Sequence, residues 1–232
     1  MHLGDCLGGY SFYDEQYAKM LDVPRYIDGG KVTEDVYATD SKVLEINSKS
    51  GLYPLFVAYN IYRRRVEEAK RKYGEVDRGF ALSLWDSTIE QNIFVICKTP
   101  MARDITRRTL VGFRNTRVNA QYYKDLIEVI KNNPATFVNE VRDGRRFWNT
   151  NNNDHMKFNA IVGNPPYQVM DGGAGVSAVP VYQYFVDIAK MINPSFISMI
   201  MPAKWYNGGR GLDGFRESML NDKRICKLFD YI

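Results

Sequence analysis

The chain has 232 residues, 45 % of them hydrophobic, which is enough to bury a sizeable core and predicts one domain. Its formal net charge of +4 is compatible with a polyanionic partner but does not demand one, and only two histidines argue against a histidine-based metal site or triad. The three cysteines are widely spaced, no apolar stretch reaches ~20 residues, and the N-terminus lacks a signal-peptide layout, so we expect a reduced, cytoplasmic protein without a membrane span.

Along the first half of the chain, strand-like and helix-like segments alternate, which is typical of an α/β sheet with crossover helices. The expected elements are a strand at 42–46, a polar loop at 47–51, a helix at 52–72, a strand at 93–97 and a helix at 100–109.

The second half continues the alternation. Here the expected elements are a helix at 119–132, a strand at 158–162, a helix at 181–192, a strand at 196–201 ended by Pro202, a helix at 212–220 and the start of a strand at 225–232. The chain stops in the middle of this pattern. We therefore expect it to be a fragment of a larger protein or a truncated gene.

The most informative motif is Asn164-Pro165-Pro166-Tyr167, which directly follows the apolar run at 158–163. A strand ending there would deliver Asn164 to the carboxyl edge of a sheet, where open α/β folds bind ligands. Because proline has no N–H, the carbonyls around Asn164 and Pro165 stay free to accept hydrogen bonds. They could accept both hydrogens of an exocyclic amine such as adenine N6, while Tyr167 offers a face for stacking.

Two interpretations of this motif compete. Asn-Pro and Pro-Pro are ordinary turn sequences, so the tetrapeptide alone could be a loop. Because the tetrapeptide directly follows a well-defined apolar strand, we favour the interpretation that it is a functional site. Drawing both amine hydrogens toward acceptors frees the nitrogen lone pair from conjugation, which predicts catalysis by positioning and electrostatics on the amino group of a flat ring.

A second candidate site is the segment from Glu45 to Gly51. An acidic strand end, a loop of small residues and a helix N-terminus commonly hold nucleotide-like ligands. Only Gly51 is a glycine and Lys49 interrupts the run, so an ordinary strand-loop-helix turn is the alternative.

Together the two segments resemble the amino-methylating DNA methyltransferases of bacterial restriction-modification systems, in the class whose cofactor motif precedes the catalytic motif. Residues 163–168 match the family's Asn/Asp/Ser-Pro-Pro-Tyr/Phe motif fully. Glu45 and Gly51 fall on the acid and the last glycine of its acid-Pro-x-x-Gly-x-Gly motif, whereas Ile46 and Lys49 depart from it. The resemblance covers about residues 31–232 and is most specific at 158–168.

The resemblance implies a Rossmann-like methyltransferase sheet with helices on both faces, which binds S-adenosylmethionine and methylates adenine N6 in double-stranded DNA. It implies that Asn164 and Pro165 accept the amine, Pro166 is scaffold and Tyr167 stacks on the base. Residues implied on the cofactor side are Glu45, Asn47, Ser50 and Gly51. The base would have to rotate out of the duplex, at a cost of a few kcal/mol.

The resemblance also divides the chain into an N-terminal extension, 1–30, and a catalytic domain, 31–232. The last strands of the sheet and the target-recognition domain are expected to be missing. An acid that holds the cofactor ribose is expected after the second strand, but Lys98-Thr99-Pro100 stands there. Asp104 and Asp86 are the remaining acids, and neither is a clear match.

Several alternatives stay open. The same catalytic motif serves methyltransferases of glutamine side chains and of ribosomal RNA guanine, and a catalytically silent DNA-binding or assembly subunit could keep the fold. An endonuclease or helicase, fused or separate, is a further expected partner. The glycine-rich segment 171–175 could close over a flipped base or simply connect two elements.

Overall fold

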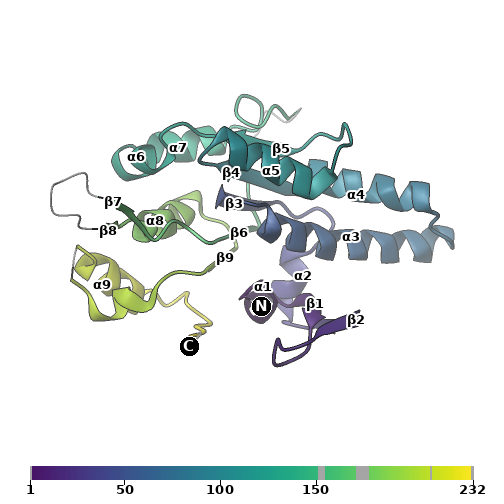
Figure 1. Ribbon diagram of the computed structural model, residues 1–232, viewed down its shortest axis with the longest axis horizontal. Helices are drawn as coiled ribbons and strands as arrows, with labels where there is room; N and C mark the ends of the chain where they lie inside the picture. The colour runs from purple at the N-terminus through teal and green to yellow at the C-terminus, as the bar shows by residue number, and fades with distance from the viewer. Residues whose placement is uncertain (1, 151–154, 171–177, 210, 231–232) are drawn as a thin grey trace.

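The computed structural model describes residues 2–150, 155–170, 178–209 and 211–230 (Figure 1). Its centre is a parallel sheet of five strands in the order β5-β4-β3-β6-β9. The strands are β3 (Val43–Ser48), β4 (Ile93–Cys97), β5 (Asn119–Tyr122), β6 (Ala160–Gly163) and β9 (Phe196–Met199). Both faces of β3 and β4 are buried, which explains why β4 is a continuous apolar run; β3 begins with apolar residues and carries the buried polar residues Glu45, Asn47 and Ser48 toward its carboxyl end.

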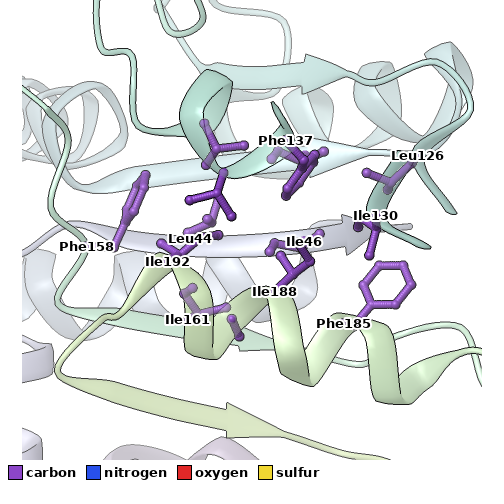
Figure 2. Packing of buried hydrophobic residues seen from close by; sticks show 14 of the residues in the cluster. Leu44, Ile46, Leu126, Ile130, Phe137, Phe158, Ile161, Phe185, Ile188 and Ile192 are labelled. Carbon is purple, nitrogen blue, oxygen red and sulfur yellow. The ribbon is translucent and has the colours of Figure 1, made fainter. Parts of the chain in front are cut away.

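Helices cover both faces of the sheet, as the sequence predicts. One face packs against α3 (Leu52–Tyr73), α4 (Arg78–Asn92) and α5 (Pro100–Val111). The other packs against α6 (Leu126–Asn132), α7 (Pro134–Val141) and α8 (Tyr182–Ile192). Figure 2 shows Phe185, Ile188 and Ile192 of α8 facing Leu44 and Ile46 of β3.

The N-terminal segment packs onto the domain. It contains α1 (His2–Leu7), the antiparallel hairpin of β1 (Gly9–Tyr13) and β2 (Met20–Ile27), and α2 (Lys31–Val36). Leu3 and Leu7 are buried in the same core as α3, and Tyr10 N donates to Asn60 Oδ1 of α3 at 2.6 Å. The division into an extension, 1–30, and a domain, 31–232, stays a prediction.

A third, smaller cluster lies beside the edge of the sheet where residues 164–167 follow β6. It is built by α8 together with a 3-10 helix, η1 (Ala203–Asn207), and α9 (Asp213–Asn221). A short antiparallel hairpin of β7 (Gln168–Met170) and β8 (Ala178–Pro180) precedes α8. No helix in the described ranges is long and apolar enough to cross a membrane.

Two expectations about elements are wrong. Residues 119–132 do not form one helix, because 119–122 pair with β4 as strand β5 and only 126–132 are helical. Asn119 fixes that strand by donating from Nδ2 to the carbonyls of Glu90 and Ile93. Residues 225–230 form no strand, and their side chains are exposed.

Candidate functional site

The two sequence-predicted segments meet at the carboxyl edge of the sheet. β3 lies between β4 and β6, and Glu45 is in register with Val162. A Cβ added at Gly163 would lie 3.6 Å from the Ile46 carbonyl oxygen and 3.9 Å from the Glu45 Cγ. The chain order reverses between β3 and β6, and open parallel sheets bind their ligands at such a switch point.

Glu45 is the ionisable group at this edge whose environment is most unusual. Its side chain is 5 % exposed, and its Oε2 has no hydrogen-bond partner among the described residues. Burial raises the pKa of the carboxyl to about 7, against a hydrogen bond from Ser48 and the charge of Lys49, which both lower it. A buried carboxylate oxygen without a partner is costly, so it suits a donor on a ligand.

The loop after Glu45 is held against α5. Asn47 is buried with a φ of 71°, and the Ser48 Oγ accepts from Gly51 N at 3.2 Å. The hydroxyls of Ser48 and Thr106 share a hydrogen bond of 3.3 Å, and the Thr109 hydroxyl donates to the Ser50 carbonyl at 2.6 Å. The loop is therefore fixed in position before any ligand arrives.

Both the backbone conformation and the close packing at position 51 require a glycine. Its φ of 77° lies in the left-handed region, where a Cβ is disfavoured. A Cβ at this position would lie 3.1 Å from Thr106 Cα and 3.3 Å from Thr109 Cβ. The glycine thus lets the start of α3 approach α5 closely.

The Asn164-Pro165-Pro166-Tyr167 motif follows β6, and the side-chain oxygen of Asn164 is unused within the described structure. The Asn164 Oδ1 is buried and makes no hydrogen bond within the described ranges, while Tyr167 is 42 % exposed. The Tyr167 carbonyl accepts from Val181 N at 3.2 Å, which ties the motif to the start of α8. An unsatisfied oxygen beside an accessible ring is the arrangement that recognition of a planar amine needs.

A cavity of about 910 Å³ opens next to this motif. Its wall includes all four motif residues, β8, the first residue of α8, η1 and Gly208–Gly209. Lys49 and Lys204 also line it and are exposed, which makes its mouth basic. Such a surface suits an anionic ligand such as a phosphate backbone.

The expected cofactor-side residues, Glu45, Asn47, Ser50 and Gly51, lie at the same sheet edge but outside the wall of this cavity. Sequence reasoning missed Ser48, which hydrogen-bonds Gly51 and α5, and the place of Lys49 in the cavity wall. The small hydroxyl side chain of Ser48 and the positive charge of Lys49 are the features of the sequence that could have indicated these roles. The segment 171–175 lies outside the described residues.

Neither of the two acids that could hold the ribose lies in a suitable place. Thr99, which follows β4, caps α5 by accepting from Ala102 N, and Asp104 is an exposed residue paired with Arg103. Asp86 lies on α4 and forms an ion pair of 2.7 Å with Arg114, which follows the C-terminal end of α5. Asp86 therefore points to the opposite edge of the sheet.

Comparison with known proteins identifies a family and a relative. The model of the Eco57I restriction-modification methylase family matches residues 91–232, more than half of the chain. An "Uncharacterized adenine-specific methylase" of Mycoplasma pneumoniae is 34 % identical over 95 residues. That alignment covers 40 % of this chain and 22 % of the relative, so this chain matches only a minor part of the relative's length.

Proposed function

The chain belongs to the Eco57I restriction-modification methylase family, and from that membership and the site we propose that it carries the catalytic centre of a DNA methyltransferase. The proposed reaction transfers a methyl group from S-adenosylmethionine to N6 of adenine in double-stranded DNA. We propose that the protein acts on DNA in the cytoplasm. An endonuclease or helicase, fused or separate, is the partner that the family suggests.

The observation that carries the proposal is the unpartnered oxygen of Asn164 at the end of β6, within the described structure. An adenine N6 amine has two N–H donors, and the Asn164 Oδ1 with the Pro165 carbonyl offers two acceptors. Accepting both hydrogens raises the electron density available on N6 as the new bond forms. The interaction is therefore stronger in the transition state than in the ground state, which is what accelerates a reaction.

Tyr167 and the basic mouth support DNA as the substrate class. The ring of Tyr167 is 42 % exposed at the cavity, where a base rotated out of the duplex can stack on it. Stacking of a base on an aromatic side chain contributes roughly 1–3 kcal/mol, which offsets part of the unstacking cost. Lys49 and Lys204 can neutralise the phosphates on either side of that base.

The residues at the Glu45 edge fit the cofactor in part. S-adenosylmethionine, when bound, supplies an electrophilic methyl group on a sulfonium centre. The Glu45 Oε2, unpartnered among the described residues, can accept from an amino or hydroxyl group, and Asn47, Ser50 and Gly51 would contact the cofactor at the same edge of the sheet. Neither Asp86 nor Asp104 is placed to hold the ribose, so we assign that contact to no residue.

The alternative substrates, a glutamine side chain or ribosomal RNA guanine, gain no support from the family match. A catalytically silent subunit would keep the fold but fail to bind the cofactor. Cofactor binding therefore separates the enzyme from the silent subunit.

The test is a calorimetric titration of the full chain with S-adenosylmethionine, followed by incubation with unmethylated DNA of mixed sequence and mass spectrometry of the released nucleosides. Saturable binding and the appearance of N6-methyladenine are the expected results. A folded chain that binds no cofactor would overturn the proposal, and methylation of cytosine instead of adenine would correct its substrate.

A further inference from the structure

Tyr182, the first residue of α8, is a buried tyrosine whose hydroxyl is unused. The side chain is 1 % exposed, and its ring packs edge-on against Phe215 at a centroid distance of 6.0 Å. The hydroxyl oxygen is fully buried and has no hydrogen-bond partner in the described part of the chain. Tyr182 also lines the cavity that Asn164 and Tyr167 line.

Two other tyrosines of the described structure, one buried and one half-buried, have satisfied hydroxyls. Tyr37, also 1 % exposed, donates to the Gly8 carbonyl at 3.2 Å, and Tyr10 donates to Glu67 at 2.8 Å. Burying a hydroxyl without a partner costs free energy, and phenylalanine would pack against Phe215 equally well without that cost. The hydroxyl at position 182 is therefore better explained by a ligand than by packing.

The chemistry of the shared cavity indicates which ligand atom the hydroxyl meets. The Asn164 Oδ1 and the Pro165 carbonyl are acceptors for the amine of a base, and Pro165 has no N–H to donate. The ring nitrogens of adenine carry lone pairs and need a donor. Burial raises the pKa of Tyr182, which keeps its hydroxyl protonated and able to donate.

Three neighbouring polar residues fit this role less well. Gln183 does not line the cavity, and its Nε2 already donates to the Pro180 carbonyl at 3.0 Å. Lys49 and Lys204 line the cavity but are exposed and charged, which suits them to phosphate.

We propose that the Tyr182 hydroxyl donates a hydrogen bond to a ring nitrogen of the flipped-out adenine and so helps to determine which base is methylated. This inference rests on the proposed function. The Asn164 Oδ1 would accept a hydrogen bond from the amine of the base, and the Tyr182 hydroxyl would donate one to the ring nitrogen beside it. Together they would recognise a base that has a donor amine next to an acceptor nitrogen.

The test compares the wild-type chain with Tyr182→Phe and with Tyr184→Phe, a control on the same helix that does not line the cavity. Each protein is assayed for methyl transfer to unmethylated DNA, for cofactor affinity and for thermal stability. We expect Tyr182→Phe to lower kcat/KM for DNA by about tenfold, the value of one hydrogen bond. Its melting temperature should be unchanged or higher and its cofactor affinity unchanged, and Tyr184→Phe should match the wild type.

Two results would overturn the inference while leaving the proposed function intact. One is a Tyr182→Phe protein that methylates adenine as fast as the wild type. The other is a loss of activity that follows a fall in melting temperature, because that assigns the hydroxyl to stability. A wild-type chain that transfers no methyl group to adenine would instead overturn the proposed function, and the role of Tyr182 with it.

Discussion

The side-chain oxygen of Asn164 makes no hydrogen bond within the described protein, so removing it should cost little stability and much activity. We expect Asn164→Ala to abolish methyl transfer and to leave the dissociation constant for S-adenosylmethionine within about twofold, since the acceptor acts mainly in the transition state. Methyl transfer to DNA and calorimetry check the two parts.

The matched control for this position is Asn164→Asp, which keeps an acceptor oxygen of the same reach. It should retain measurable activity where Asn164→Ala has none. Appreciable methylation by the alanine variant would show that the oxygen is not needed.

We expect Glu45 to make the stability of the unliganded chain depend on pH. Burial raises its folded-state pKa from the ordinary 4.5 to about 7, so the folded protein holds the proton more tightly than the unfolded chain does. The stabilising contribution is complete below the unfolded pKa of 4.5 and is lost as the pH rises through about 7. A difference of this size between the two pKa values corresponds to roughly 3 kcal/mol.

Urea unfolding at about pH 5 and about pH 8 measures this effect, because a group that holds its proton more tightly in the folded state makes the free energy of unfolding fall as the pH rises. The wild type should lose stability between the two values, and Glu45→Gln, which cannot ionise, should lose markedly less. Equal pH dependence in the two proteins would mean that burial does not raise the pKa of Glu45 in the folded chain.

At the scale of single residues, the sequence predicted that the Asn164-Pro165-Pro166-Tyr167 motif follows a strand, but not what surrounds it. The catalytic roles of Asn164 and Pro165 stay predictions, which could be made because their chemistry is local to a strand end. The place of Tyr182 beside the motif could not be predicted, because it depends on the β7–β8 hairpin that returns the start of α8 to the motif. The sequence already lacks an acid at the place expected to hold the ribose. The ion pair of Asp86 with Arg114 shows that Asp86 lies too far away to replace it.

At the scale of elements, Gly51 joins β3 to α3 and lets the start of α3 lie close to α5. Gly51→Ala would place a Cβ in a left-handed conformation and against Thr106, so we expect it to destabilise the protein by about 1–2 kcal/mol or more. Because the same loop lies beside Glu45, cofactor affinity should fall as well. Thermal unfolding and calorimetry measure the two effects.

The control is Gly74→Ala at the other end of α3. Gly74 also has a positive φ, 84°, but a Cβ there would meet nothing within 4 Å among the described residues. This variant should lose stability through its backbone and keep its cofactor affinity. If both variants bound the cofactor normally, the Gly51 loop would not belong to the cofactor site.

Most of the elements that the sequence analysis expected are present, because their hydrophobic pattern agrees with their final pairing. The N-terminal hairpin and α4 were not predicted. The strand at 93–97 and the helix beginning at Leu52 match β4 and α3 closely. The helix expected at 119–132 was wrong because Asn119 and Ala120 are buried by β4 and not by a helical neighbour. The expected strand at 225–230 has no neighbouring strand in the described structure, and a strand without a partner leaves its backbone groups unpaired.

At the scale of the whole molecule, the N-terminal segment contributes to the central core. Leu7 of α1 is 2 % exposed and packs in the cluster that contains Val57 and Ile61 of α3. We expect Leu7→Ala to lower the free energy of unfolding by about 2–5 kcal/mol, as for other large-to-small core substitutions. Urea unfolding measures the change.

The control for Leu7→Ala is Leu220→Ala on α9. Leu220 is 63 % exposed, so its loss should change stability by no more than about 0.5 kcal/mol. A Leu7→Ala protein as stable as this control would mean that residues 1–30 form a dispensable extension.

The pairing of β3 with β6 has a consequence for how the protein is made. Lys42 N, just before β3, bonds the side chain of Asn159, just before β6, across 117 residues of sequence. At the usual speed of translation, β6 leaves the ribosome on the order of ten seconds after β3. During that interval the edge of β3 that later pairs with β6 has no neighbouring strand. Because α3 and β4 are synthesised earlier, they can cover one face and the other edge of β3 until β6 is made.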